Sequence, residues 1–467
     1  MHWRSTRTVT RRPWLLARGN VTAMLRADSE MCDHAVDLCQ RLIRIDTTNP
    51  PGNEREAAHL LATEFSAAGL DPKVLESAPG RANVVVRHKG TGAKPPLLLT
   101  AHLDVVEADA SQWRYPPFSG VIAEGCLWGR GAIDMKNHAA MSVALVTRLA
   151  RENIRLDRDI IFAGVADEEA GCEFGSAWLC DNHADLVRAE YAIGEGGGFN
   201  LNLGGKRFFT VQVAEKGFCW VRARVRGEPG HGSMPRNDSA ITKLAQGVLR
   251  LAKGLPPHRT RVVSDFLAGI ASAQPALVKP ILSAITKTDI LPRLVKLLPD
   301  ASVARALGAM LSNTASATVV RAGNKTNVIP GLAELEIDGR TLPGQSDADF
   351  LRELGDVLGP EFELEVMRSA PPVETEPVAS PLYDRILGVL REREPDATPI
   401  PYMIPGFTDA KSFTRLGARW YGFSPVLLPP DMRFADMFHG HNERIPIDGL
   451  RWGTEVLTDV VCGFAGG

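Results

Sequence analysis

The chain has 467 residues, 44% hydrophobic and 23% charged, and its 53 Lys and Arg against 55 Asp and Glu leave a net charge of −2. A chain of this length typically folds into two or three domains with a large core. The balanced charge argues against a nucleic-acid partner, and the composition argues against disorder. The longest apolar stretches, such as 95–101, fall short of the roughly 20 residues that a membrane span needs, so no membrane partner is expected.

Residues 1–25 are the one place where a targeting signal would stand. The pair Arg11-Arg12 suggests a twin-arginine signal, but Arg18 interrupts the apolar segment of about 7–15 residues that such a signal requires. We therefore expect either a poorly ordered N-terminal extension or a start codon assigned too far upstream. The seven cysteines are odd in number, widely scattered and without a C-x-x-C pair, which favours reduced thiols in a cytoplasmic protein over a disulfide framework.

The first half of the chain alternates helical and strand patterns. The strands are apolar throughout, which is typical of a sheet covered on both faces. The sequence therefore predicts an α/β fold over residues 26–216, with a central, mostly parallel sheet between layers of helices. The expected helices lie at 35–44, 54–68 and 139–149 and from about 174, and the strands at 83–87, 97–102, 160–166 and 191–193.

The pattern changes after residue 216. Residues 217–226 alternate apolar and polar side chains, and a β-α-β-β-α-β order follows. This order predicts an inserted ferredoxin-like α+β domain over 217–372, interrupted by an apolar, helix-leaning insertion at 257–313. Residues 373–467 return to the alternation of helices and strands seen in the first half of the chain, and they complete the first domain. The remaining elements of the insert are expected at 240–252, 318–321, 332–340, 347–357 and 361–366.

Residues with metal-binding chemistry follow several of these elements. His102 and Asp104 end a strand and point to one face, so that the carboxylate can orient a ligating imidazole; a simple surface pair is the commoner explanation of such a motif. Asp134 stands on a Gly-rich turn before a helix, where it either bridges two metals or caps the helix.

Acidic residues follow two further strands. Asp167, Glu168 and Glu169 come directly after the strand at 160–166; they need a cation if they are buried and form an acidic surface loop if they are not. Glu195 lies among glycines that either form a flexible turn or place this carboxylate beside the others. No phosphate-binding glycine pattern is present there.

His439 and His441 flank a glycine in a polar loop near the C-terminus, and their spacing does not decide which one binds a metal. Each of these signals is weak alone. Together they place histidines and acidic residues at successive strand ends, where ligands of α/β folds gather. The sequence therefore predicts one metal site at this edge of the sheet.

Seven short motifs occur in order along the chain: Ala101–Asp104, Trp128–Lys136, Ala166–Glu169, Gly230–Gly232, Asn327–Pro330, Asp338–Arg340 and His439–Glu443. With them the chain resembles the M20 metallopeptidases, the family of aminoacylase-1, succinyl-diaminopimelate desuccinylase and carboxypeptidase S. The resemblance runs from Ala35 to Gly463. The long 257–313 segment looks most like the carboxypeptidase S branch.

The resemblance implies two zinc ions per subunit, with cobalt or manganese as substitutes. Asp104 would orient His102, and Glu168 would act as the general base that takes a proton from water and passes it to the leaving amine. The resemblance also implies a cis peptide bond after Asp134. The ligands it implies are His102 and Glu195 on one ion, Glu169 and His439 on the other, and Asp134 on both.

The ferredoxin-like insert resembles the family's lid, which also forms its dimer interface, so a homodimer is expected. His231 would reach the active site of the partner subunit and help to hold the oxyanion. Asn327 and Arg340 would grip the carboxylate of the substrate, a task that suits a guanidinium. Gly406 would line the substrate site.

These expectations combine into a dizinc hydrolase that cleaves an amide bond next to a free carboxylate, in an N-acyl amino acid or a short peptide. Deacylation of N-succinyl-diaminopimelate is the nearest alternative. A non-catalytic, metal-stabilised binding protein would usually lack the base or a ligand, whereas Glu168 and all the expected ligands are present. Phosphate binding by 194–198 fails because no Lys or Arg accompanies these residues.

Overall fold

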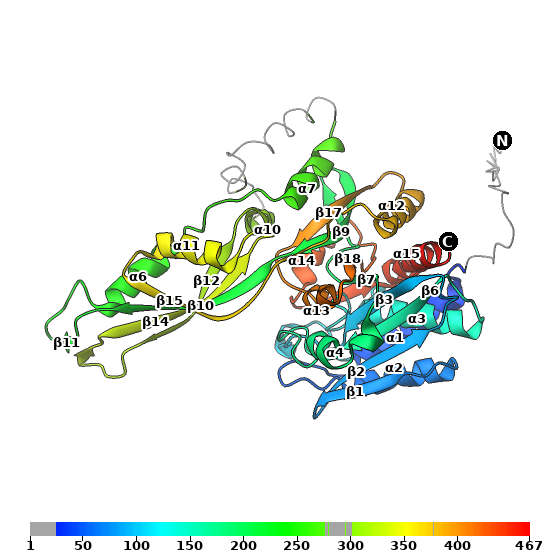
Figure 1. Cartoon of the computed structure of the whole chain (residues 1–467), viewed down its shortest axis with the longest axis horizontal. Helices are drawn as coiled ribbons and strands as arrows, with labels where there is room; N and C mark the ends of the chain where they lie inside the picture. The colour runs from blue at the N-terminus through cyan, green and yellow to red at the C-terminus, as the bar shows by residue number, and fades with distance from the viewer. Residues whose placement is uncertain (1–24, 276–278, 280–294, 296–300, 377) are drawn as a thin grey trace, which may run out of the picture.

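The computed structural model describes residues 25–275, 279, 295, 301–376 and 378–467. The chain forms a large α/β domain and a long arm that projects from it (Figure 1). The expected N-terminal extension lies outside the described residues apart from Leu25. Within the 257–313 insertion, residues 276–300 lie outside them apart from 279 and 295. No helix in the described ranges is long and apolar enough to cross a membrane.

A ten-stranded sheet forms the centre of the large domain. Its strands are β1 (Lys73–Ala78), β2 (Arg81–His88), β3 (Lys94–His102), β6 (Arg158–Val165), β7 (Tyr191–Gly194), β8 (Asn200–Leu203), β9 (Lys206–Glu215), β16 (Val373–Glu374), β17 (Thr398–Ile404) and β18 (Arg419–Gly422). They run in the order β1-β2-β6-β3-β7-β18-β9-β16, with β8 and β17 also paired to β9. The central strands β6, β3, β7 and β18 are parallel to their neighbours in that group, which confirms the predicted α/β architecture.

Helices cover both faces of this sheet. Because successive side chains of a strand point to opposite faces, Leu97 and Leu99 of β3 pack against one helical layer and Leu98 against the other. The first layer holds α1 (Ser29–Ile43), α2 (Arg55–Ala67), α3 (Lys136–Arg151), α12 (Pro381–Arg393) and α15 (Ile447–Ala465). The second layer holds α4 (Ser176–Asn182), α5 (Ala184–Val187) and α13 (Ala410–Phe413).

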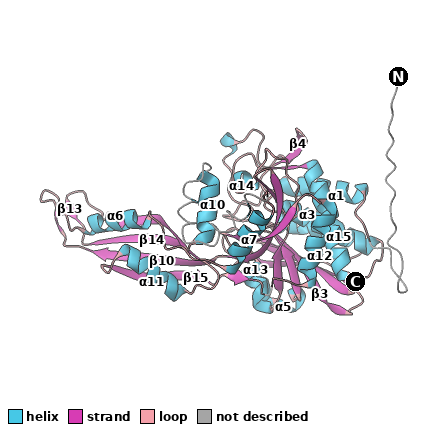
Figure 2. Cartoon of the chain, turned by 90° about the horizontal axis from the view of Figure 1, so that it is seen from above, coloured by secondary structure: helices cyan, strands magenta, loops and turns pink. Residues whose placement is uncertain are grey.

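The arm is built on a second, antiparallel sheet. Its elements are β10 (Gly217–Arg226), α6 (Ala240–Leu251), β12 (Thr314–Ala322), β14 (Leu332–Thr341), α11 (Asp347–Leu358) and β15 (Phe362–Ala370). The strands run in the order β12-β14-β10-β15, and both helices pack on one face, as in a ferredoxin-like α+β domain. At the far end, β11 (Gly230–His231) pairs with β13 (Val328–Ile329) to form the tip of the arm (Figure 2).

The chain crosses between the two sheets twice. β9 passes directly into β10 around residue 216, and β15 returns to β16 through residues 371–372. The described ends of the insertion lie near this junction: α7 (Arg261–Ser272) packs against β17 and β9, and α10 (Ala301–Leu311) leads into β12. The first helix of the insertion therefore contacts the large domain, although its sequence position falls between elements of the arm.

Candidate metal centre

Three parallel strands end at the same edge of the large sheet, and polar residues stand at their ends. His102 is the last residue of β3, Glu168 and Glu169 lie just beyond β6, and Glu195 follows β7 directly. Because the carboxyl ends of parallel strands meet at one edge, these side chains converge. Asp134 joins them from the turn that precedes α3.

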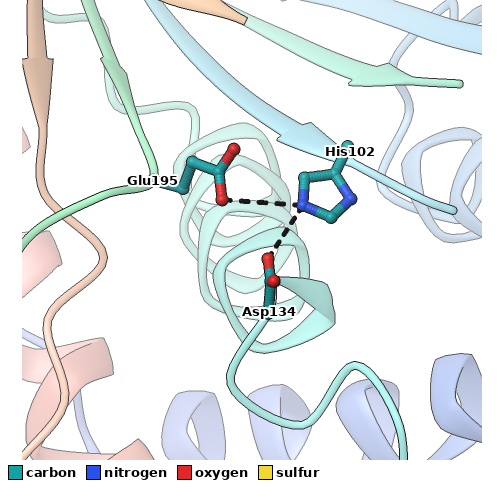
Figure 3. Close-up of side chains that lie close together, drawn as sticks. All are labelled: His102, Asp134 and Glu195. Carbon is teal, nitrogen blue, oxygen red and sulfur yellow. Dashed lines mark hydrogen bonds and ion pairs between the residues drawn. The ribbon is translucent and has the colours of Figure 1, made fainter. Parts of the chain in front are cut away.

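The two carboxylate oxygens of Asp134 face different imidazoles. Oδ1 lies 3.0 Å from Nε2 of His102, and Oδ2 lies 3.1 Å from Nε2 of His439, in the loop after α14 (Phe434–Met437). Glu195 lies 3.6 Å from the same nitrogen of His102 (Figure 3), and Glu169 lies 3.1 Å from the same nitrogen of His439. Asp134 therefore stands between two His–Glu pairs, where a carboxylate can bridge two cations.

His102, Asp134, Glu168 and Glu195 are buried whereas His439 is exposed, and the carboxylates of the cluster outnumber its imidazoles. Burial raises the pKa of Glu195 to about 8, and burial together with the charge of Glu195 raises the pKa of Glu168 well above its usual value. Burial alone would lower the pKa values of the imidazoles, yet the surrounding carboxylates raise that of His102 well above its usual range and that of His439 to about 10. These shifts indicate a need for added positive charge. A divalent metal with nitrogen and oxygen ligands fits this donor set.

Three overlapping groups in the described part of the chain bring possible metal-ligating atoms within 4.8 Å of one another: His102 with Asp134 and Glu195, Asp134 with Glu169 and His439, and His102 with Glu168 and Glu169. Glu168 therefore borders the cluster without belonging to either half around Asp134. His441 is exposed and belongs to none of these groups, so the geometry favours His439 of the two loop histidines.

The turn that presents Asp134 is held by a buried carboxylate, Glu443. It accepts hydrogen bonds from the backbone N–H groups of Gly131 (3.1 Å), Ile133 (2.8 Å) and Asp134 (3.3 Å). The guanidinium of Arg130 donates to the same carboxylate at 2.8 Å. Burial raises the pKa of Glu443 to about 7, against the lowering effect of Arg130. Sequence reasoning included this residue in a motif but gave it no role.

Asp134 is not a helix cap. The N-cap residue of α3 is Met135, which makes no side-chain capping hydrogen bond, so that alternative is wrong. The peptide bond between Asp134 and Met135 is cis, as the family resemblance implies. Lys136 then turns inward and donates to the backbone oxygens of Leu42 (3.0 Å) and Ile45 (2.8 Å), which ties the start of α3 to the end of α1.

Asp104 contacts both an imidazole of the cluster and the loop that carries Glu168. Nδ1 of His102 lies 2.9 Å from the backbone oxygen of Asp104 and 3.6 Å from its Oδ1. The same carboxylate accepts hydrogen bonds from the backbone N–H groups of Glu168 and Glu169, each at 3.1 Å. Such contacts orient the imidazole and fix the acidic loop, and the sequence indicates only the first of these tasks.

A network of buried side chains supports the same loop. Arg81 donates two hydrogen bonds to Glu54 (2.9 and 2.8 Å) and one to Asp167 (2.9 Å). The amide of Asn49 donates to Asp104 (2.8 Å) and Asp167 (3.1 Å). The only sequence signal for this network is an arginine at the head of an apolar strand. Its partners are far apart in the chain, so no local pattern reveals them.

Arg340 and Gly406, two of the expected substrate residues, lie where the arm joins the large domain. Arg340, near the end of β14, donates to both carboxylate oxygens of Asp338 at 2.8 and 3.0 Å. Its guanidinium lies 5.5 Å from the ring centre of Phe407, the residue after Gly406. A Cβ added to Gly406 would meet no atom within 4 Å, so the space beside this loop is open.

His231 belongs to β11 and Asn327 directly precedes β13. These two paired strands lie at the tip of the arm, far from the large domain (Figures 1 and 2). The backbone oxygen of Asn327 accepts a hydrogen bond from Gly232 at 2.9 Å, and Nδ1 of His231 lies 2.8 Å from the hydroxyl of Ser233. Both His231 and Asn327 are exposed. Within one subunit these two residues are not brought to the metal cluster.

Comparison with known proteins places these features in a family. The model of peptidase family M20/M25/M40 matches residues 98–462. The chain is 30% identical over 385 residues to the N-fatty-acyl-amino acid synthase/hydrolase PM20D1 of Homo sapiens, covering 78% of this chain and 73% of that protein. It is 28% identical over 378 residues to the probable carboxypeptidase S-like 2 of Dictyostelium discoideum, covering 76% and 69%. It is 25% identical over 452 residues to aminoacylase-1 of Mus musculus, covering 95% and 98%.

Solved structures share the fold at low sequence identity. An M20 family metallo-carboxypeptidase from Sulfolobus solfataricus superposes with a TM-score of 0.69 and 19% identity, covering 93% of this chain and 99% of that one. A dinuclear metal-binding peptidase of the family from Bacillus subtilis gives 0.59 and 13%, covering 94% and 99%. The family match includes every strand end that carries the cluster. The chain therefore belongs to peptidase family M20/M25/M40 and is a metal-dependent hydrolase.

Proposed function

We propose that this protein is a two-zinc hydrolase that cleaves an amide bond next to a free carboxylate. The observation that carries the proposal is the position of Asp134 between two His–Glu pairs, which offers two adjacent sets of nitrogen and oxygen ligands. His102 and Glu195 would hold one ion, Glu169 and His439 the other, and Asp134 both. Three carboxylates neutralise most of the charge of two divalent ions, and cobalt or manganese would suit the same donors.

Glu168 is the side chain we assign to proton transfer. It is buried beside the cluster and is not needed as a ligand in either half. Bound metal ions would polarise the substrate carbonyl and lower the pKa of a water molecule. Glu168 would accept a proton from that water at a carboxylate oxygen and then donate it to the leaving nitrogen. Asp104 keeps both the proton carrier and one expected metal ligand in place, because it binds the backbone of Glu168 and the ring of His102.

Arg340 supports a substrate with a free carboxylate. A guanidinium recognises a carboxylate through two parallel hydrogen bonds, and Arg340 already binds Asp338 in this way, so its fork geometry is set before a substrate arrives. Gly406 leaves open space beside the adjoining loop. The names of the relatives, which include an aminoacylase and a carboxypeptidase S-like protein, favour an N-acyl amino acid or a short peptide with a free C-terminus.

We further propose a homodimer formed through the arm, which would serve as a lid. The outer face of α6 is apolar: Ile241 and Leu249 are 46% and 68% exposed, and they lie two turns apart on one side of the helix. The neighbouring edge strand β12 leaves Val320 58% exposed. Large apolar side chains exposed on neighbouring elements favour an interaction site, and a second copy of the arm is the partner that we expect to cover it.

A dimer would give the two residues at the tip of the arm a role in catalysis. His231 and Asn327 are exposed and remote from the metal cluster of their own subunit, which supports a role in the partner's active site. There His231 would donate a hydrogen bond to the oxyanion that develops on the substrate carbonyl, and Asn327 would bind its carboxylate together with Arg340.

Amine release across a substrate panel tests the proposed reaction. The panel holds N-acetyl and long-chain N-acyl amino acids, dipeptides and N-succinyl-diaminopimelate, and it is run on zinc-loaded protein with the Glu168→Ala variant as the blank. Release from N-acyl amino acids or dipeptides that is absent in the blank supports the proposal, whereas release from the succinyl substrate alone selects the desuccinylase alternative. If no substrate of the panel releases an amine although two metals are bound, the proposed substrate class is wrong, and a metal-stabilised binding protein is favoured.

The cytoplasm is the compartment that we propose. All seven cysteines are buried and unpaired, which suits a reducing environment. Immunodetection after cell fractionation would test this, and recovery of the protein outside the cytoplasmic fraction would contradict it.

A further inference from the structure

One lysine ties together the two chain segments that join the arm to the large domain. Lys411, on α13, donates from Nζ to the backbone oxygen of Lys216 at 2.8 Å and to that of Pro371 at 3.4 Å. Lys216 lies on the outgoing segment and Pro371 on the returning one. The same ammonium pairs with Glu215 at 2.9 Å. The strands on either side of the junction pair directly with each other, β10 with β15 and β9 with β16, and Lys411 holds the two segments between these pairings.

The partner carboxylate is completely enclosed. Glu215 has no exposed surface, and its second oxygen accepts hydrogen bonds from the hydroxyl of Thr408 at 2.6 Å and the amide of Gln212 at 3.4 Å. Burial raises the pKa of Glu215, and Lys411 is the first of the neighbours that act to lower it. A buried ion pair of this kind contributes little net stability but strongly favours one geometry, because any displacement leaves a charge without its partner.

The same short segment also contacts the base of the arm. Phe407 packs its ring 5.9 Å from the ring of Phe218 on β10 and 5.5 Å from the guanidinium of Arg340 on β14. Residues 407–411 thus touch both crossing segments and the arginine to which we assign the substrate carboxylate. Any change in the spacing of the crossings moves Arg340 relative to the metal cluster, because the arm is one continuous sheet from β10 to β14.

We propose that Lys411, acting through its pair with Glu215, is a positioning residue that sets the angle of the arm against the large domain. In the proposed reaction, this angle places Arg340 at the distance from the metal cluster that matches the substrate carboxylate. The kinetic part of the inference rests on the proposed function, whereas the structural part does not. A misplacement of about 1 Å in such a site can reduce the rate about 100-fold.

Distance measurements on the intact, metal-loaded protein test the structural part. Spin labels on the Glu56→Cys and Asp356→Cys positions, exposed on α2 and α11, report the separation of the large domain and the arm. The native cysteines are buried, so the introduced thiols react selectively. Labelled protein is diluted with unlabelled protein, so that distances within one chain dominate.

The decisive variant is the double substitution Glu215→Gln and Lys411→Met, which removes the pair without leaving a buried charge alone. We expect its distance distribution to broaden, and Lys411→Arg to keep the narrow distribution of the natural protein. Lys89→Met is the matched control, because Lys89 pairs with Asp159 at 3.2 Å on the large sheet away from the junction. If the double variant does not fold, Glu215→Gln alone serves, since its glutamine retains the acceptor for Thr408.

Kinetics separate the two parts of the inference. With the substrate found in the panel, KM should rise about tenfold in the double variant, while zinc content and the activity of Lys89→Met stay unchanged. An unchanged distance distribution in a folded double variant would overturn the inference. A broadened distribution in a protein that hydrolyses nothing on the panel would uphold the hinge role of Lys411 and refute the proposed function instead. A broadened distribution with unchanged KM would refute the link to Arg340.

Discussion

Asp134 presents one carboxylate oxygen to each half of the cluster, so a change at this residue should act on both halves. Glu195, by contrast, faces His102 alone. We therefore expect Asp134→Asn to weaken both metal sites, and Glu195→Gln to weaken one and leave the other. Titration of chelator-treated protein with zinc by calorimetry should show two tight sites in the natural protein, one in Glu195→Gln and none in Asp134→Asn. A single lost site in Asp134→Asn would contradict the bridging position.

Glu168 differs from its neighbours because a proton carrier, unlike a ligand, should be dispensable for metal binding. General acid–base groups contribute typically 10²–10⁴-fold to a rate, so we expect Glu168→Gln to reduce kcat by about 10³-fold with both metals retained. Elemental analysis beside the kinetics checks this, with Glu124→Gln, a surface carboxylate, as the control. Loss of one metal in Glu168→Gln would instead assign Glu168 as a ligand, in the group that it forms with His102 and Glu169.

At the scale of elements, strand ends are where sequence reasoning succeeded. The expected strands at 97–102 and 191–193 end in the structure at His102 and Gly194, the same position and one residue later. A continuous apolar run bounded by polar residues or glycine has few ways to be buried, so its end is well defined. Once the strands are parallel, their carboxyl ends must share an edge, and the convergence of His102 and Glu195 follows from the sequence alone.

Other elements were predicted with wrong bounds or not at all, because the interactions that determine them are not local apolar patterns. α1 begins at Ser29 and not at 35, because the side chain of Asp28 accepts a hydrogen bond from Met31 and caps a polar first turn. The edge strand β1 is half-exposed along its length and carries no clear alternation. The bond from Gly131 to Glu443 spans 312 positions in the chain, a separation that no sequence window covers.

Glu443 offers a test of how far the Asp134 turn depends on a distant element. Replacing it by glutamine removes the charge that pairs with Arg130 inside the protein and weakens three backbone hydrogen bonds. Breaking a buried pair in this way costs about 3–5 kcal/mol, so Glu443→Gln should lower the urea midpoint and also weaken zinc binding. Glu455→Gln, which breaks a partly exposed pair with Arg393, should change neither by much. Unchanged zinc affinity in a destabilised Glu443→Gln would show that the turn forms without it.

For the molecule as a whole, the buried cluster makes the stability of the metal-free protein depend on pH. The pKa of Glu195 is raised to about 8 and that of His439 to about 10, so the folded protein binds more protons than the unfolded chain between the usual and the raised values. The stability that these two groups contribute is complete below their pKa values in the unfolded chain and is lost as pH rises through their raised pKa values. The stability of the metal-free protein should therefore fall from about pH 5 to 10. Zinc bound by these side chains would replace those protons, so the stabilisation that added zinc provides should grow over the same pH range. Calorimetric melting with and without zinc checks this, and a constant difference would contradict it.

The arm raises the question of which subunit's active site its tip residues serve. β11, which carries His231, lies at the far end of the arm, away from β3 and β7 at whose ends the metal cluster stands (Figure 1). An active site that needs this imidazole therefore receives it either from a partner subunit or after the arm folds back. Mixing two inactive variants distinguishes the two cases. In a dimer of His231→Ala with Glu168→Ala, action across the interface leaves one site with both residues intact, whereas action within a subunit leaves none.

Random reassembly makes half of the dimers mixed, each with one complete site of two, so recovery should approach about a quarter of the natural activity. Leu249→Lys introduced into both variants provides the control, because a charge on the exposed apolar face of α6 should keep the subunits apart and abolish recovery. Absence of recovery in mixed dimers verified by mass would assign His231 to its own subunit, and that result would require the arm to fold back over the cluster. The experiment therefore decides whether a single chain contains a complete active site or only two separated parts of one.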